Sequence, residues 1–419
     1  MTEHFDGLET RDPAVREAAL LSALPAQVAA AQRTAAFAEI LRGVDAAAVL
    51  SRAALARLPV TRKHELLERQ KAQRPQDPFG GFSAIGWRGL GTARTARHVF
   101  QSPGPIYEPG GHAPDYWRFG RALHAAGFRP GDLVHNSFSY HLTPAGSMVE
   151  TGALAVGCTV FPGGVGNTEL QLQAMAELRA DGYAGTPSFL RILLEKADET
   201  GVALPALRKA SVGGEAFPAA LRDALRARGI EAYQSYGTAD LGLVAYETPA
   251  REGLVLDEGV IVEIVRPGSG DPVPDGEVGE LVVTVLNPDY PLVRFGTGDL
   301  SAFMPGHCPT GRSNRRIKGW MGRADQTAKV RGMFVHATQV AEVLKRHPEL
   351  SRARLVIEGE MANDRMTMHA EAAAQAEGLA HAVAATVRDI TKLRCEVRVV
   401  APGSLPNDGK VVEDLRRID

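Results

Sequence analysis

The alternation of short apolar runs with helical segments after Gly131 is the feature that most constrains the fold. Four of these runs have the length of buried strands: Asp132–Asn136, Gly157–Phe161, Ala210–Val212 and Ala232–Gln234. Helical segments separate them, and such alternation is typical of a mostly parallel sheet covered by helices. We therefore predict an α/β fold with a large layered N-terminal domain.

The segments between these runs carry signals for helix ends. Thr168–Gln171 has the sequence of a capping box, and the apolar face of its helix would include Leu178. Gly182 is suited to end that helix. Thr186, followed by proline, predicts the start of the next helix, which should stop near Gly201.

Residues 12–75 are predicted to be mainly helical. Asp12 can cap the first helix, Pro25 is expected to break it, and a second helix should run to about Leu41. Thr61 is predicted to cap a later helix.

The C-terminal part has a different pattern. Val260–Val265 and Glu280–Val285 alternate in polarity, which indicates a hairpin-like β-section. A smaller α+β lid follows, so we predict domains at 1–323 and 324–419. The lid elements are expected to be a helix from Thr338, strands at Ala353–Ile357, Met366–Ala370 and Glu396–Val400, and a helix over 376–393.

Composition and charge limit the kinds of molecule that the protein is expected to bind. The 419 residues carry a formal net charge of −2, so no global basic field favours nucleic acid or an anionic membrane. No run approaches the roughly 18 apolar residues of a membrane helix, and the N-terminus lacks signal-peptide features. Three widely spaced cysteines, Cys158, Cys308 and Cys395, fit a reducing compartment. We expect a cytoplasmic protein that binds a small molecule, without nucleic acid or membrane.

Gln234–Asp240 follows a predicted strand, and ligands bind at the carboxyl ends of parallel strands. The Tyr236 ring can stack on a purine, while backbone N–H groups and Thr238 can meet a phosphate. Asp240 can hold Mg²⁺ through an oxygen. A plain strand-to-helix turn is the structural alternative.

Ser211–Glu215 also ends a predicted strand. Its glycines, Gly213 and Gly214, allow a flat base to approach the backbone closely. A tight turn without a ligand explains the same residues.

Leu292–Gly332 contains two glycine-rich turns, each centred on an acid, about two dozen residues apart. Asp299 lies in Thr-Gly-Asp and can accept hydrogen bonds from neighbouring hydroxyls, such as those of a ribose. Arg323 and Asp325 form the second turn. The segment Lys329–Phe334 after it is predicted to be an edge strand with two cations on one face.

Together these motifs resemble those of the adenylate-forming acyl-CoA synthetase superfamily, most closely its phenylacetate-CoA ligase branch, from about Leu58 to Lys410. The resemblance implies an ATP-dependent aryl- or acyl-CoA ligase that works through an acyl-adenylate. ATP, Mg²⁺ and coenzyme A would be its cofactor and co-substrates, and a carboxylic acid, expected to be aromatic, its substrate. Homodimers are common among such proteins, so a homodimer is also expected.

The resemblance assigns roles residue by residue. Tyr236 matches a residue that faces adenine, Asp240 stands where a glutamate binds Mg²⁺, and Ala239 replaces a hydroxyl residue that contacts phosphate. Asp299 would take both ribose hydroxyls and Asp325 would be a hinge. The implied nucleotide and coenzyme contacts are Gly213, Gly214, Glu215, Ser235, Tyr236, Gly237, Thr238, Asp299, Arg323, Lys329, Arg331 and Gly332.

Lys410 resembles the family's catalytic lysine. It lies in Pro406–Lys410, where the proline-to-lysine spacing is one residue tighter than in the family. A mobile cation can stabilise the charge that gathers between the acyl oxygen and phosphorus. A surface lysine of a C-terminal tail is the alternative.

Phe100–Pro109 does not fit the resemblance. The family has a Ser/Thr/Gly-rich phosphate loop ending in lysine, whereas this segment has three prolines, no lysine, and only Ser102 and Gly104 as remnants. A second hypothesis is therefore a non-catalytic or repurposed homologue that binds a nucleotide or acyl-CoA. A third is an adenylating enzyme whose acceptor is an amine or a carrier protein.

An aromatic cluster, Phe138, Tyr140 and His141, would suit a flat aryl acid if it lies beside Gly213, although core packing explains it equally well. His307-Cys308 also raises the question of a metal site, but no second cysteine lies nearby.

Overall fold

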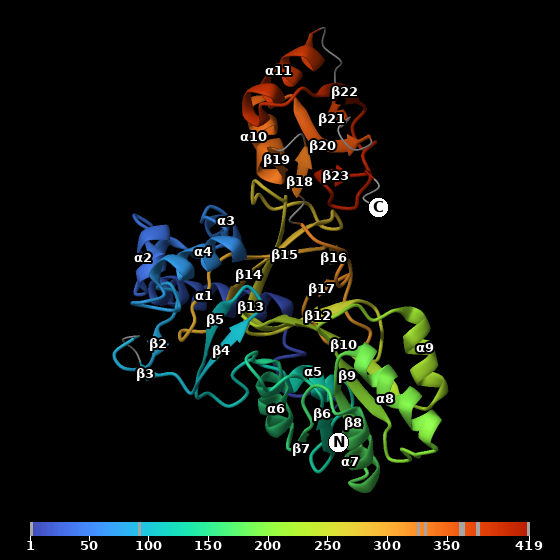
Figure 1. Ribbon diagram of the computed structural model, residues 1–419. Coiled ribbons are helices and arrows are strands. Elements are labelled where there is room, and N and C mark those ends of the chain that lie inside the picture. The colour runs from blue at the N-terminus through green and yellow to red at the C-terminus, as the bar shows by residue number, and fades with distance from the viewer. Residues whose placement is uncertain are drawn as a thin grey trace. The chain divides into compact units, whose positions relative to one another are not determined.

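The computed structural model describes residues 3–90, 94–324, 327–330, 333–359, 365–373 and 378–416. Two compact units make up the chain (Figure 1). The first contains Met1–Val262, Val283–Phe295 and Met304–Gly319, and the second contains Glu263–Val282, Gly296–Phe303 and Trp320–Asp419. Parts of the predicted β-section thus belong with the C-terminal residues. The functional domains 1–323 and 324–419 stay a prediction.

A nine-stranded sheet forms the centre of the first unit, in the order β16-β17-β12-β11-β10-β9-β8-β6-β7. Strands β6 to β9 and the start of β10 pair in parallel, whereas β11, β12 and β17 continue the sheet with antiparallel pairs. The parallel part confirms the predicted fold class. The strands are β6 (Leu133–Asn136), β7 (Thr159–Pro162), β8 (Gly182–Gly185), β9 (Lys209–Val212), β10 (Glu231–Thr238), β11 (Gly242–Glu247), β12 (Leu254–Leu256), β16 (Phe303–Met304) and β17 (Arg316–Ile317).

Helices cover both faces of the parallel strands. Tyr183 and Ala184 are successive residues of β8, yet they belong to different core clusters. Successive side chains of a strand point to opposite faces, so one cluster contains α5 and α6 and the other contains α7, α8 and α9. These helices are α5 (Gly120–Ala125), α6 (Ala145–Val156), α7 (Thr168–Glu177), α8 (Pro187–Thr200) and α9 (Ala219–Ala227).

Three details of this region were predicted wrongly. The strand predicted at Gly157–Phe161 is present as β7, but it lies at the sheet edge with two exposed and two half-buried residues, so it is not a buried strand. The capping box is absent, since α7 begins after Asn167 in the left-handed conformation with no side-chain cap bond. Gly182 begins the buried strand β8 instead of ending a helix, and Leu178 is exposed.

The N-terminal helices also differ from the prediction. Asp12 does cap α1, accepting from the N–H groups of the next turn, but the helix continues through Pro25. Packing of buried residues such as Leu24 and Val28 outweighs the lost hydrogen bond. Thr61 lies in strand β1 and does not cap the helix that follows. The elements are α1 (Pro13–Gln32), α2 (Ala35–Ile40), η1 (Ala46–Ala48), α3 (Arg52–Ala56), β1 (Thr61–Arg62) and α4 (Lys63–Gln73).

Two short strand pairs follow these helices, the parallel pair β2–β3 and the antiparallel hairpin β4–β5. Strands β13 to β15 join β1 in a four-stranded sheet ordered β1-β15-β14-β13. The division between the units falls within these three long strands. The strands are β2 (Ile85–Gly86), β3 (Arg94–Thr95), β4 (His98–Ser102), β5 (Ile106–Gly110), β13 (Val260–Val265), β14 (Gly279–Val285) and β15 (Phe295–Ser301).

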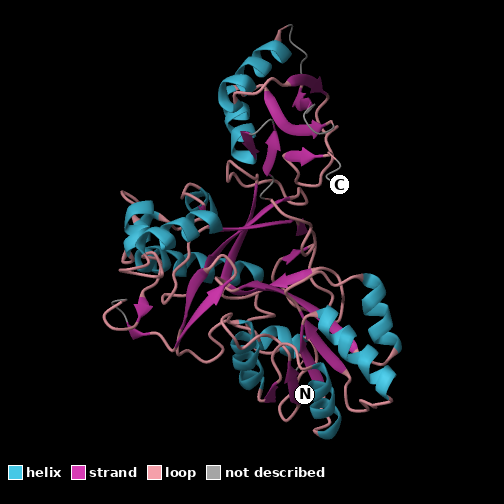
Figure 2. Cartoon of the chain, in the orientation of Figure 1, coloured by secondary structure: helices cyan, strands magenta, loops and turns pink. Residues whose placement is uncertain are grey.

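The C-terminal part of the second unit is an α+β structure with its own core. Figure 2 shows its two helices along one side of the strands. The described helices are α10 (Ala337–Arg346) and α11 (Leu379–Thr391), and the strands are β18 (Thr327–Val330), β19 (Met333–His336), β20 (Leu350–Glu358), β21 (Arg365–Ala372), β22 (Glu396–Val400) and β23 (Val412–Asp414). Within the described ranges, every helix is too short or too polar to span a bilayer.

A buried arginine ties the N-terminal segment to the first unit. The Arg294 side chain donates to the backbone oxygens of Ala56 and Leu58, at 2.8 and 2.5 Å. Its own backbone oxygen accepts from the N–H of Thr61 at 3.0 Å. The guanidinium therefore fixes the chain that leads into α4.

We expect Arg294→Met to lower the free energy of unfolding by about 2–4 kcal/mol, because two buried carbonyls lose their donor. Urea denaturation of the purified protein measures this change. The matched control is Arg191→Met on α8, where the arginine is exposed and, among the described residues, pairs with Glu195, so a change below about 0.5 kcal/mol is expected. Equal effects of the two substitutions would contradict the anchoring role.

Candidate active site

The two glycine motifs of the first unit lie side by side. Val212 of β9 pairs with Gln234 of β10, and a Cβ atom added at Gly213 would lie 3.0 Å from both the backbone oxygen and Oγ of Ser235. A side chain at Gly213 would force Ser235 to shift by a few tenths of an ångström, so glycine suits this close approach. The sequence predicted both motifs, and their adjacency follows from the pairing of β9 with β10.

Gln234–Thr238 is a strand rather than the predicted loop. After Gln234, β10 leaves β9 and pairs with β11, with an irregular register between Tyr236 and Gly237. A Cβ atom at Gly237 would come within 2.5 Å of the Gly242 oxygen, so this position requires glycine. Tyr236 is half-buried at the irregularity.

The predicted acid-binding residues are only partly brought together. The Phe138 ring lies 3.8 Å from a Cβ position at Gly214, which confirms that an aromatic ring adjoins the glycine pair. The Tyr140 hydroxyl accepts from the Asn136 amide at 2.8 Å, and burial raises the pKa of Tyr140. His141 is exposed.

Glu215 has a structural partner in the first unit. Its exposed side chain accepts from the backbone N–H of Ser188 at 2.6 Å, at the start of α8. A carboxylate in the first turn of a helix is favourable, so part of what Glu215 does is to cap α8.

Asp240 lies at the turn between β10 and β11, and its side chain is fully buried. The Lys63 ammonium pairs with Oδ2 at 3.0 Å, while Oδ1 has no hydrogen-bond partner in the described part of the chain. No local pattern pointed to Lys63 as a partner of Asp240, because the two residues are 177 positions apart in the chain. An orphaned carboxylate oxygen of this kind fits a hard cation such as Mg²⁺.

The proline-containing segment forms the hairpin of β4 and β5. Its one serine hydroxyl, on Ser102, donates to the buried Glu108 carboxyl, which also accepts from the Ser102 N–H at 3.3 Å. Burial and the nearby Asp240 carboxylate raise the pKa of Glu108 to about 8. Ser102, one of the two residues of this segment that resemble the family's phosphate loop, therefore already donates its hydroxyl hydrogen to Glu108. Glu108, like Lys63, was not predicted as a site residue from the sequence.

In the second unit, the two acid-centred turns meet. Asp299 of β15 forms an antiparallel bridge with Arg323. Its Oδ1 accepts from Nη1 of Arg323 at 2.9 Å and from Nε1 of Trp320 at 3.0 Å. Both donors belong to half-exposed side chains. The sequence predicted Asp299 and Arg323 separately, and it missed Trp320.

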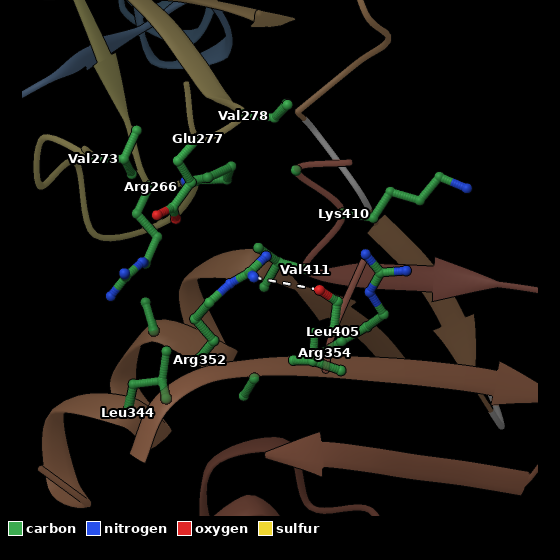
Figure 3. A pocket seen from close by; sticks show the side chains of 14 residues that line it. Arg266, Val273, Glu277, Val278, Leu344, Arg352, Arg354, Leu405, Lys410 and Val411 are labelled. Atoms are coloured by element: carbon green, nitrogen blue, oxygen red, sulfur yellow. Dashed lines mark hydrogen bonds between the residues drawn. The ribbon is translucent and has the colours of Figure 1, made fainter. Parts of the chain in front are cut away.

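Lys410 is half-exposed and pairs with Glu413 at 2.9 Å. It lies at a small pocket of the second unit that arginines also line, and Figure 3 shows its side chain directed away from Arg266 and Arg352. The preceding Asn407 accepts from the Val278 N–H at 3.0 Å and donates to the Gly276 oxygen at 3.2 Å. The lysine loop is thus held on the turn between β13 and β14.

Several predicted residues are not placed. Asp325, Arg331 and Gly332 lie outside the described residues. Lys329 belongs to β18, which pairs antiparallel with β19, so the predicted single edge strand at 329–334 is wrong and two paired strands are present.

The Cys308 thiol is buried between two hydroxyl groups. Its Sγ lies 3.3 Å from Oγ1 of Thr248 and 3.1 Å from Oγ1 of Thr310. Across the described ranges, no cluster of three or more His, Cys, Asp or Glu side chains forms a potential metal site.

A sequence model of the family described as "AMP-binding enzyme" matches residues 124–285. A phenylacetate-coenzyme A ligase of Aromatoleum evansii is 33% identical over 325 residues, covering 74% of this chain and 70% of that protein. One from Thermus thermophilus is 30% identical over 330 residues, covering 71% and 74%.

A solved structure of 2-hydroxyisobutyryl-CoA ligase, in an open conformation with 2-HIB-AMP and CoA, is similar in fold. Its TM-score is 0.69 at 24% identity, covering 95% of this chain and 90% of that chain. From the extent and identity of the sequence matches, the chain belongs to the AMP-binding enzyme family, in the branch of the phenylacetate-coenzyme A ligases.

Proposed function

We propose that this chain is an AMP-forming acid–coenzyme A ligase. A carboxylate attacks the α-phosphate of ATP to give an acyl-adenylate and pyrophosphate, and the thiolate of coenzyme A then displaces AMP. Membership of the family supports this reaction, and the observation that carries it is the Asp299 carboxylate held by Arg323 and Trp320. That carboxylate would accept hydrogen bonds from the ribose hydroxyls.

Residues of the first unit would bind the adenine base of the nucleotide and the carboxylic acid substrate. The half-buried Tyr236 ring would face the adenine, and the Gly213-Gly214 backbone would allow it to approach closely. Phe138, next to Gly214, would contact the acid. An aromatic acid suits a flat ring lying on glycine, and we propose that class of substrate.

Magnesium would bind Asp240. Its unpartnered Oδ1 is an oxygen ligand of the kind Mg²⁺ takes. The ion would neutralise phosphate charge as pyrophosphate leaves.

Lys410 would supply the mobile positive charge for adenylation. Negative charge develops between the attacking carboxylate and the α-phosphate, and a cation placed there lowers the barrier. To act, Lys410 must leave Glu413, which costs little because the ion pair is exposed. Residues 324–419 would move as the lid, about Asp325.

The similarity to ligases favours this function over a nucleotide-binding homologue without catalysis. We further propose a cytoplasmic homodimer, as the family resemblance implies.

Pyrophosphate exchange driven by an aryl acid tests adenylation. Product analysis with coenzyme A present or absent then separates a thioester-forming enzyme from one that uses an amine or a carrier protein. Absence of acid-dependent exchange would contradict the proposal.

We predict that Lys410→Ala lowers pyrophosphate exchange by about 10²- to 10³-fold, because the developing charge loses its cation. Thioester formation from supplied acyl-adenylate should change much less. Lys392→Ala is the control, since that lysine is exposed on the same unit and its ion pair in the described ranges is with Asp389. Unchanged exchange in Lys410→Ala would refute the assigned role.

We also predict that Asp299→Asn weakens AMP binding by about tenfold or more, because an amide is a weaker acceptor than a carboxylate and disturbs the Arg323 pair. Calorimetric titration with AMP gives the dissociation constant. Asp389→Asn, an exposed change in the same unit, should leave it unaltered. A ribose contact at Asp299 would be excluded by equal AMP affinity in the variant and the parent protein.

A further inference from the structure

A cluster of buried polar groups surrounds Asp240 in the first unit. Asp240 keeps one carboxylate oxygen without a partner, and the buried hydroxyl of Tyr290 also lacks one among the described residues. Burial raises the pKa of Tyr290, and the charges of Asp240 and Glu108 add to this shift. Buried polar atoms are nearly always satisfied, so the unpartnered oxygen of Asp240 indicates a place for a ligand.

Lys63 is the cation of this cluster and its most exposed member. The Lys63 side chain is 37% exposed, whereas that of Asp240 is 0% exposed. The ammonium therefore contacts a buried carboxylate on one side and is open to solvent on the other. An ammonium group has three donors, so it can also meet an incoming anion.

The position of Lys63 is fixed by the fold. It is the first residue of α4, directly after β1, and the Thr61 N–H donates to the Arg294 backbone oxygen. Four side-chain bonds nevertheless leave the ammonium free to move by a few ångströms. Lys63 can thus exchange one anionic partner for another without any change in the backbone.

The hairpin of β4 and β5 lacks the means to bind phosphate. Pro103 and Pro105 have no N–H to donate, the Ser102 hydroxyl is engaged by Glu108, and the segment contains no lysine. A triphosphate carries several negative charges beyond the α-phosphate. The ligase proposed above therefore needs a cation from elsewhere in the chain.

We propose that Lys63 is the residue that binds the β- and γ-phosphates of ATP, giving up its ion pair with Asp240 when Mg²⁺ binds that carboxylate. In the nucleotide-free protein the ammonium neutralises Asp240. When Mg²⁺ takes the carboxylate, the ammonium is released next to the phosphates that accompany the metal. This inference rests on the proposed function and adds the source of the missing phosphate-binding charge.

A purely structural role makes a different prediction. If Lys63 only neutralises Asp240, its removal destabilises the protein and affects all nucleotides alike. If it binds the outer phosphates, its removal weakens ATP and spares AMP, which has only the α-phosphate. The ratio of the two affinities therefore separates the roles.

The test is calorimetric titration of the full chain with ATP plus Mg²⁺ and, separately, with AMP. We expect Lys63→Met to weaken ATP binding at least tenfold and to leave AMP binding within about twofold. Lys63→Arg keeps the charge and should retain ATP affinity within about threefold. Lys71→Met is the control and should change neither affinity, because Lys71 lies on the exposed face of the same helix and pairs with the exposed Glu68.

Lys63→Gln controls for a loss of folding in Lys63→Met, because its amide can still donate a hydrogen bond to Asp240 although it carries no charge. It should lose ATP affinity as Lys63→Met does. Equal losses for ATP and AMP, or unchanged ATP affinity in the Gln variant, would overturn the inference while leaving the ligase proposal standing. If the parent protein binds neither nucleotide, the proposed function itself fails.

Discussion

The buried carboxylate of Asp240, with one oxygen unpartnered among the described residues, is the feature on which the arrangement of the candidate site in the first unit depends. An isolated charge in a protein interior is costly unless it is paired, and Asp240 has Lys63 on only one of its oxygens. The fold holds the backbone of that one partner in place, since Arg294 fixes the segment that leads into α4. The Asp240 carboxylate thus stays charged and buried at the turn after β10 because Lys63 is held beside it. Apolar packing around the carboxylate would not stabilise that charge.

Burial of both sheet faces explains why the candidate residues gather where they do. Helices cover the parallel strands on each side, so polar groups have room only at the strand ends. There Gly213 lies against Ser235, and Phe138 adjoins Gly214. Glycine at these positions serves two purposes, because it lets the backbones approach and leaves one side of the turn open to a flat ligand.

The sequence predicted features that depend on neighbours along the chain. Buried parallel strands such as β9 stand out as apolar runs, and Asp299 stands out by its Thr-Gly-Asp turn. Features that depend on distant partners were missed, since nothing near Lys63 signals Asp240. Local rules also failed where packing opposed them: α1 passes through Pro25 because its apolar face is buried on both sides of the proline.

If Lys410 acts as proposed, the loop that carries it in the second unit would set an energetic threshold for adenylation. Asn407 holds it by two hydrogen bonds, and a Cβ atom at Gly409 would lie 2.8 Å from the Val278 side chain, so the loop fits closely on its turn. At about 1 kcal/mol for each hydrogen bond, this arrangement favours the held state by a few kcal/mol. A bound acid and ATP must offer Lys410 more than that before the loop leaves. In the proposed mechanism, the free energy of substrate binding would therefore drive the loop of Lys410 off the turn between β13 and β14. A loop held less tightly on that turn would depend less on bound substrate for its movement.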